Sequence, residues 1–166
     1  MNAENYYPQY AAHLAIGFFA GVRSAEIQRM TWGDIYWDEG VIFVGRGKVN
    51  AQQRRVPLLP NCRAWLERYR GDDDQYICNT KDVSHGIMRV AESAGVEWVP
   101  NGPRHSFISY RRVVLGGNLH QLTDEAGNSP AVIKRHYSRP VPAKDADAFF
   151  AITPRQSKIN PLPVAV

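Results

Sequence analysis

Three short runs of β-forming residues lie close together in this 166-residue chain: Ile35–Trp37, Val41–Val44 and Arg54–Leu58. Asp38-Glu39-Gly40 separates the first two runs and is a turn signal. A polar segment containing two glycines, residues 45–53, joins the second run to the third. The sequence therefore predicts a small antiparallel sheet of three strands with a basic hairpin between the last two, and any fold of this chain must place these strands together.

Helical segments separated by glycine and proline make up most of the remaining chain. We expect helices over residues 8–22, 24–30, 60–69, 81–94, 104–115, 119–126 and 143–151, and one more that starts at Pro130 and carries Tyr137. Ser24 and Ser129 are the expected N-caps of the helices that follow them. The length is that of one domain, so the predicted fold class is α+β, mainly α: a helical domain with a small three-stranded antiparallel sheet.

The composition excludes several classes of protein. Hydrophobic residues make up 44% and charged residues 22% of the chain, near the averages for globular proteins, which excludes general disorder. Cys62 and Cys78 are too few for a disulfide framework, and no histidine has the spacing of a metal ligand pair, so we expect no metal. The longest apolar run, residues 14–22, is shorter than the ~20 residues that cross a bilayer, and residues 1–10 do not resemble a signal peptide. We expect a cytoplasmic protein without membrane contact.

Positive charge is concentrated in two segments of the chain. The net charge is only +4, but residues 45–59 carry four basic side chains and no acidic one, and residues 101–140 carry six basic and two acidic ones. Segments of this kind can converge on a groove for nucleic acid, and they can also be ordinary solvated faces. Charge alone leaves both interpretations open.

Two arginines and a tyrosine stand out by their positions. Arg23 and Arg104 both lie at expected helix starts, and Tyr137 lies in the basic stretch KRHYSR. Taken singly, the arginines are typical of helix caps or ion pairs, and the tyrosine is typical of packing. Together they offer what phosphoryl transfer needs, because two guanidinium groups can stabilise phosphate charge and a tyrosine near cations can act as a nucleophile.

A lysine on the basic hairpin would complete this chemistry as the proton donor to a leaving oxygen. Lys48 lies at the hairpin tip, and Arg46 occupies a similar place two residues earlier. Arginine is too basic to donate a proton, so Lys48 is the preferred candidate and Arg46 the alternative.

Four stretches in this order resemble the catalytic domain of tyrosine recombinases, the phage-integrase family: GVRSAEIQRMTWGDI, GRGKVNAQQRRVPL, NGPRHSFISY and EAGNSPAVIKRHY. The resemblance extends from about Ala11 to Phe150. It implies a catalytic domain over residues 1–153 and a C-terminal tail, 154–166, that is extended or docks on a neighbouring protomer. Members of the family usually carry an N-terminal core-binding domain, and we expect this domain to be absent from this chain.

The resemblance also implies a reaction, and this reaction needs no cofactor. Tyr137 would attack a phosphate of duplex DNA and form a 3′-phosphotyrosyl link, Arg23 and Arg104 would clamp the phosphate, and Lys48 would protonate the leaving oxygen. The implied partners are double-stranded DNA and further copies of the chain, with a tetramer at synapsis and a monomer or weak dimer when free. The implied setting is a bacterial or phage-derived protein associated with the nucleoid.

Two positions depart from the family pattern. Asn101 stands where the family usually has histidine. Asn128 stands where the family usually has histidine or tryptophan. An asparagine can donate a hydrogen bond to phosphate but cannot transfer a proton near neutral pH. His105 and His136 lie next to these motifs and could compensate, although packing is the more ordinary role for each.

Further basic and histidine side chains are candidates for contacts with DNA. They are Arg46, Arg54, Arg55, His105, Arg111, Arg112, Lys134, Arg135 and His136. Two alternatives to recombination remain open at this point: a catalytically weakened DNA-binding or regulatory relative, which the two asparagines favour, and a type IB topoisomerase-like enzyme that nicks and rejoins one strand.

Overall fold

The computed structural model describes residues 8–45, 53–136 and 141–155. The predictions made for Arg46, Lys48 and Tyr137, and for residues 156–166 of the tail, lie outside the described residues.

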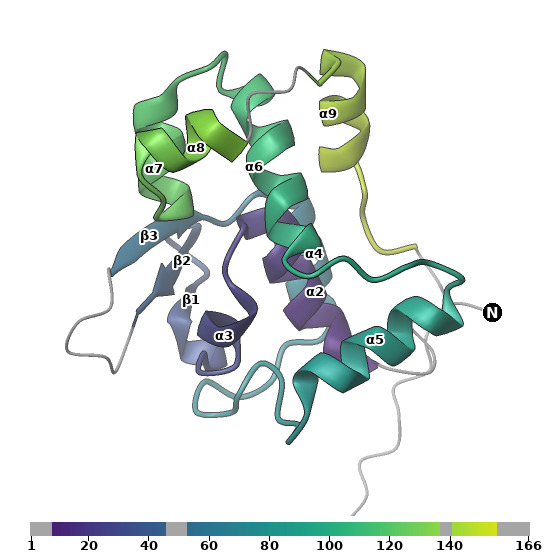
Figure 1. The fold of residues 1–166 in the computed structure, drawn as a ribbon. Coiled ribbons are helices and arrows are strands. Elements are labelled where there is room, and N and C mark those ends of the chain that lie inside the picture. The colour runs from purple at the N-terminus through teal and green to yellow at the C-terminus, as the bar shows by residue number, and fades with distance from the viewer. Residues whose placement is uncertain (1–7, 46–52, 137–140, 156–166) are drawn as a thin grey trace, which may run out of the picture.

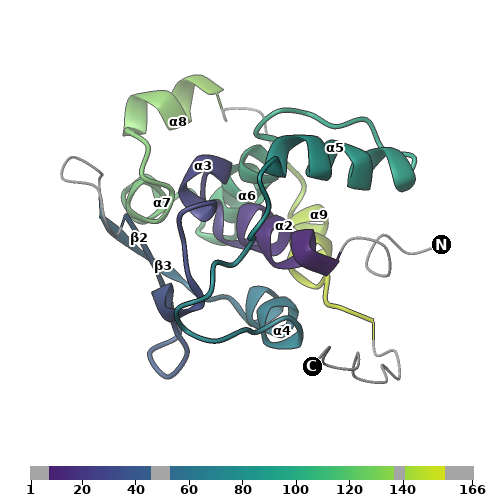
Figure 2. The same cartoon turned by 90° about the horizontal axis from the view of Figure 1, so that it is seen from below.

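A central apolar helix, α2 (Pro8–Ala20), organises the fold (Figure 2). It contacts α3 (Ser24–Ile27), α4 (Pro60–Arg68), α5 (Val83–Ser93) and α6 (Gly102–Val114). Because neighbours surround it, α2 is apolar on most sides, and residues such as Ile16 and Phe19 are buried in the largest cluster of the core.

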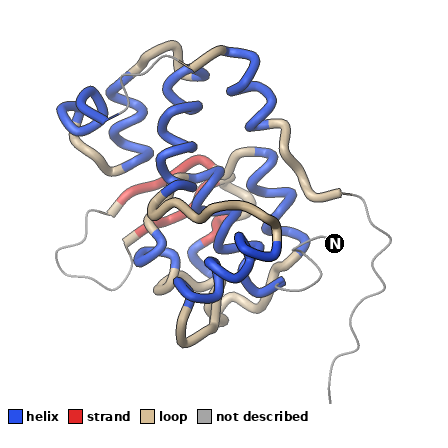
Figure 3. The backbone as a smooth tube through the Cα atoms, turned by 45° about the vertical axis from the view of Figure 1, so that its right-hand side comes forward, coloured by secondary structure: helices blue, strands red, loops and turns tan. Residues whose placement is uncertain are grey.

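The predicted sheet is confirmed and lies at one edge of the helical body (Figures 1 and 3). A 3₁₀ helix, η1 (Trp32–Asp34), leads into β1 (Ile35–Tyr36), which pairs with β2 (Val41–Val44), which pairs in turn with β3 (Arg54–Pro57). Both pairings are antiparallel, and Val44 lies opposite Arg54. Alternate residues of β2 and β3 are buried, so one face of the sheet contributes to the core.

The C-terminal helices form a second layer around α6. Helix α7 (Leu119–Ala126) contacts β3 and α8 (Pro130–His136), and these helices share a small core with α6 that includes Phe107, Leu122 and Ile133. Helix α9 (Ala143–Phe150) packs on α6, where the ring of Phe149 stacks on Tyr110 with centroids 4.5 Å apart. No helix in the described ranges is both long and apolar enough to span a membrane.

The predicted helix over residues 24–30 is wrong in its end and in its cap. Helix α3 ends at Ile27, and Arg23, not Ser24, is its N-cap residue. After Ile27 the amides of Arg29 and Met30 donate to carbonyls three residues back, at 3.0 Å each, so the α-helical pattern stops. The Met30 carbonyl then accepts from the Ile77 amide at 3.1 Å. The remaining helices lie close to their predicted ranges, and Ser129 caps α8 as expected, with its Oγ 3.4 Å from the Val132 amide.

Candidate active site

A tight turn at Gly21 places Arg23 at the start of α3. Gly21 has a φ of 63°, and a Cβ added there would lie 2.2 Å from a ring carbon of Phe107 on α6. Only glycine therefore allows α6 to approach the turn between α2 and α3 this closely. The approach brings the beginning of α6, which carries Arg104, against the residues that precede Arg23.

The Arg23 guanidinium is held by three acceptors. Nη1 donates to Glu26 Oε1 at 3.2 Å, and Nη2 donates to the Gly127 carbonyl at 3.2 Å and to Asn128 Oδ1 at 2.9 Å. The side chain nevertheless remains 42% exposed. Arg23 is thus fixed in orientation while still accessible from solvent.

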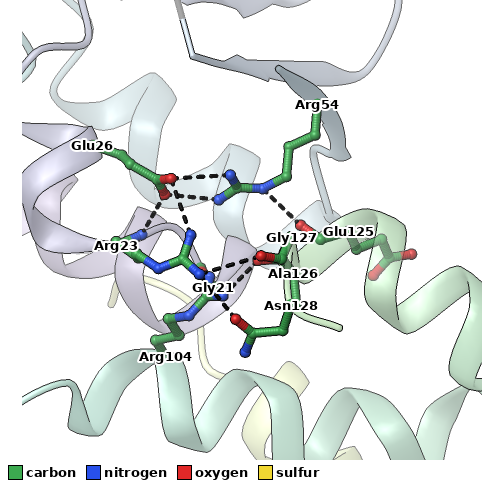
Figure 4. A network of polar contacts seen from close by, with 9 residues as sticks. All are labelled: Gly21, Arg23, Glu26, Arg54, Arg104, Glu125, Ala126, Gly127 and Asn128. Atoms are coloured by element: carbon green, nitrogen blue, oxygen red, sulfur yellow. Dashed lines mark hydrogen bonds and ion pairs between the residues drawn. The ribbon is translucent and has the colours of Figure 1, made fainter. Parts of the chain in front are cut away.

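Glu26 lies between two arginines (Figure 4). Arg54 on β3 donates Nη1 and Nη2 to its two oxygens at 3.1 and 2.8 Å, and the Arg23 amide donates to Oε2 at 3.0 Å. Burial would raise the pKa of Glu26, but the hydrogen bonds and charge of Arg54, with the amide and charge of Arg23, lower it to about 2. The carboxylate is therefore ionised across the physiological range.

Arg104 joins two distant segments from inside the protein. It is only 6% exposed, and it donates Nη1 to the Gly21 carbonyl and Nη2 to the Ala126 carbonyl, the latter at 2.5 Å. Figure 4 shows its guanidinium reaching the same turn between α7 and α8 that Arg23 contacts. The structure thus brings Arg23, Arg104 and Asn128 together.

This group of residues is electropositive. The cluster of Figure 4 holds three guanidinium groups: Arg23 and Arg54 bind the carboxylate of Glu26, and Arg104 binds backbone carbonyls. The carboxylate of Glu125, by contrast, is paired bidentately with Arg111. An excess of positive charge beside an accessible arginine suits an anion with several oxygens, such as a phosphate.

Asn101 lies beside Arg104, without a described contact to Arg23. It is the exposed N-cap residue of α6, and its φ of 58° is in the left-handed region that asparagine tolerates. With Arg104, Ser24 and His13 it lines a small cavity of about 40 Å³.

Two of the residues predicted to contact DNA, Arg54 and Arg111, are buried in this structure. Arg54 is 8% exposed and makes a bidentate pair with the carboxylate of Glu26. Arg111 is 9% exposed and makes a bidentate pair with the carboxylate of Glu125. A DNA phosphate would have to displace these buried partners, so contact of either arginine with DNA stays a prediction that burial disfavours.

The other predicted contacts are distributed over the surface. Lys134 and Arg135 on α8 are exposed, and Arg55 on β3 is exposed and paired with Glu39. His105 is exposed and Arg112 is half-buried on α6, whereas the side chain of His136 is outside the described part. Within the described ranges, no group of three side chains could hold a metal ion.

Sequence reasoning missed the central position of Glu26 and the burial of His13. The spacing Arg23-x-x-Glu26 is visible in the sequence, but it indicates a helix cap rather than a link to β3. His13 is 3% exposed, its Nε2 lies 3.0 Å from Ser24 Oγ, and burial lowers its pKa to about 4. No local pattern distinguishes it from an ordinary core histidine.

The fold is similar to that of the catalytic domains of recombinases and integrases. It matches a crystal structure of XerA recombinase with a TM-score of 0.69 at 21% identity, over 92% of this chain and 61% of that one. It also matches the Tn1549 transposon integrase, solved in complex with circular intermediate DNA, with a TM-score of 0.58 at 16% identity, over 86% and 58% of the two chains. A third match is the integrase from mycobacterium phage Brujita, with a TM-score of 0.55 at 17% identity, over 91% and 62%.

The chain belongs to the phage integrase family, whose sequence profile matches residues 1–111. The tyrosine recombinase XerA of Thermococcus kodakarensis is 33% identical over 135 residues, which cover 72% of this chain and 47% of that protein. The chain therefore spans about half the length of this curated relative.

Proposed function

We propose that this chain is the catalytic part of a tyrosine recombinase that cleaves and rejoins duplex DNA at specific sites. The observation that supports this most directly is the convergence of Arg23, Arg104 and Asn128 from three distant segments. Family membership and the resemblance to the XerA fold support the same conclusion.

In this proposal the two arginines stabilise the scissile phosphate. Arg23, which is partly exposed, donates to non-bridging oxygens, and Arg104 turns from its carbonyl partners toward the phosphate or holds the turn that binds it. Asn128 orients Arg23 through the bond to its Nη2, and Asn101 lies at the start of α6, where an amide can donate to a phosphate oxygen.

The covalent step involves two residues outside the described part of the chain. Tyr137 loses its phenol proton to solvent, and its oxygen forms a bond to phosphorus while the bond from phosphorus to the 5′ oxygen breaks. Lys48, or a group held by the same hairpin, gives a proton to that departing oxygen. The phosphotyrosyl ester keeps the phosphodiester's energy, so a 5′-hydroxyl of a partner strand can reverse the step without a cofactor or metal.

The partners follow from this reaction. We propose double-stranded DNA as the substrate, contacted through exposed cations such as Lys134 and Arg135, and an assembly of several copies on the DNA, with four at synapsis. The reaction places the protein in the cytoplasm with the nucleoid.

The test is a search for a covalent adduct with DNA. A pool of nicked duplexes with a randomised central window traps the intermediate, because the short strand beyond the nick diffuses away and cannot rejoin. The chain should form an adduct that resists SDS, and Tyr137→Phe should abolish it. Tyr76→Phe, which changes an exposed tyrosine that is not part of the cluster of Figure 4, should not.

The outcome separates the three functions. DNA binding without an adduct would contradict catalysis and favour a regulatory relative. A topoisomerase-like function would be favoured by an adduct that forms together with relaxation of supercoiled DNA, without exchange between partner duplexes. Exchange between two duplexes carrying a recovered sequence would establish recombination.

A further inference from the structure

Arg54 has a pattern of contacts that the proposed reaction does not use. Its three donor nitrogens contact Glu26 Oε1, Glu26 Oε2 and the Glu125 carbonyl, at 3.1, 2.8 and 3.1 Å. Its side chain is 5% exposed, so these bonds are shielded from water. Arg54 therefore connects β3 to α3 and to the end of α7.

The same side chain supports the turn that carries Asn128. A Cβ added to Gly127 would lie 3.1 Å from both Cδ and Nη1 of Arg54, so the Gly127 backbone rests directly on the arginine. The Gly127 carbonyl and the Asn128 side chain are in turn two of the three acceptors that hold Arg23. Arg54 thus reaches Arg23 by two routes, one through Glu26 and one through Gly127.

The route through Glu26 has an electrostatic consequence. Arg54 engages both carboxylate oxygens, whereas the Arg23 guanidinium makes one longer contact of 3.2 Å with the same group. The negative charge of Glu26 is therefore balanced mainly by Arg54, and the charge of Arg23 remains available to an incoming anion. Without Arg54, Arg23 would be the only cation bonded to Glu26 in the described structure, and the two would pair with each other.

We infer that Arg54 is a positioning residue of the active site: it binds Glu26 and supports Gly127, so that Arg23 is oriented by these neighbours but not neutralised by them. This inference rests on the proposed DNA cleavage. It means that a residue of strand β3 sets how much positive charge Arg23, at the start of α3, presents to the DNA.

The test compares four variants in the rate of adduct formation, with the nicked duplex recovered from the randomised pool. Arg54→Met should lower the rate at saturating DNA by about 100-fold. Without Arg54, Arg23 is drawn to Glu26 and no longer lies where it stabilises the phosphate. The DNA concentration that gives half the maximal rate should change no more than in Arg63→Met. This control removes one charge and one ion pair, that with Glu67, on α4.

The third variant is the double substitution Arg54→Met with Glu26→Gln. If Arg54 acts by balancing the charge of Glu26, removing that charge should restore at least about tenfold of the lost rate, a coupling within the range seen for residues in contact. A purely structural role for Arg54 predicts the opposite, since a second change in the cluster would lower the rate further. The fourth variant, Arg54→Lys, keeps the charge with one donor group, and should lose about tenfold.

Each outcome has a separate meaning. A wild-type chain that forms no adduct would overturn the proposed function, and this inference with it. If the wild type is active, two results would overturn the positioning role alone. One is Arg54→Met or Arg54→Lys reacting at the wild-type rate, and the other is a double variant no faster than Arg54→Met. If Arg54→Met does not fold, as judged by circular dichroism, Arg54→Lys decides: a tenfold loss supports the role and an unchanged rate overturns it.

Discussion

Arg23 and Asn128 are 105 residues apart in sequence, and Nη2 of the arginine lies 2.9 Å from Oδ1 of the asparagine. The family pattern places histidine or tryptophan where this chain has Asn128. In this chain the position supplies an acceptor to Arg23, an arginine of the proposed active site, so the amide orients a cation even though it cannot transfer a proton.

Substitutions of Asn128 should separate orientation from proton transfer. Asn128→Ala removes the acceptor and should slow adduct formation by about 100-fold, because the Arg23 guanidinium loses a fixed contact. Asn128→His keeps a ring nitrogen that can accept and adds a group that can titrate, so its rate should equal or exceed that of the wild type. Single-turnover rates on the nicked duplex measure both, and complete loss in the histidine variant would show that the amide geometry itself is required.

Gly127→Ala should destabilise the fold through two effects that a matched control can separate. The φ of 63° disfavours a side chain by roughly 1–2 kcal/mol, and crowding against Arg54 should add about 1–3 kcal/mol. Gly40→Ala has the first effect alone, because Gly40 has a φ of 64° and no atom within 4 Å of an added Cβ. Urea unfolding should therefore show the larger loss for Gly127→Ala, and equal losses would mean that Arg54 yields without cost.

Arg111→Met and Lys134→Met should have opposite profiles. Breaking the buried pair of Arg111 with Glu125 leaves an unpaired carboxylate and should lower the free energy of unfolding by about 3–5 kcal/mol, with the salt dependence of DNA binding unchanged. Lys134 is exposed on α8, so its loss should leave stability almost unchanged and reduce the slope of log K against log salt by about 0.9. A reduced slope of log K against log salt in a folded Arg111→Met protein would instead support the prediction that Arg111 contacts DNA.

His13 should make the protein sensitive to moderate acid. Burial lowers its pKa to about 4, below the value of 6.5 expected for an unfolded chain, so the unfolded state binds the proton first as pH falls. The stability that depends on neutral His13 is complete above pH 6.5 and should decline by about 3 kcal/mol between pH 6.5 and 4. His13→Gln should flatten this part of the stability curve, and His85→Gln, which changes an exposed histidine of α5, should not.

The elements of the fold follow from local sequence more fully than the contacts between them. The positions of glycine and proline, together with the spacing of apolar residues, predict the strands and where most helices begin and end. The end of α3 was not predictable in this way. The segment after it bonds to residues remote in sequence, as the Met30 carbonyl does to the Ile77 amide, and local patterns carry no information on that pairing.

The same limit applies inside the site. Arg54 and Arg55 are adjacent and chemically identical, yet one is buried against Glu26 and the other is exposed beside Glu39. Their alternation on β3, with Val56 buried on the Arg54 side, is a signal the sequence does contain. That Glu26 would lie opposite the buried arginine depends on how α3 and the sheet pack, which periodicity does not specify.

The long sequence separation between Arg23 and Asn128 also affects how the protein is made. At a synthesis rate of ~5–20 residues per second, the 105 residues between them take roughly 5–20 s to emerge from a ribosome. During that interval the chain has Arg23 but neither the Asn128 side chain nor the Gly127 carbonyl that orients it. The proposed site therefore cannot assemble in a nascent chain until α7 and the turn after it have been translated.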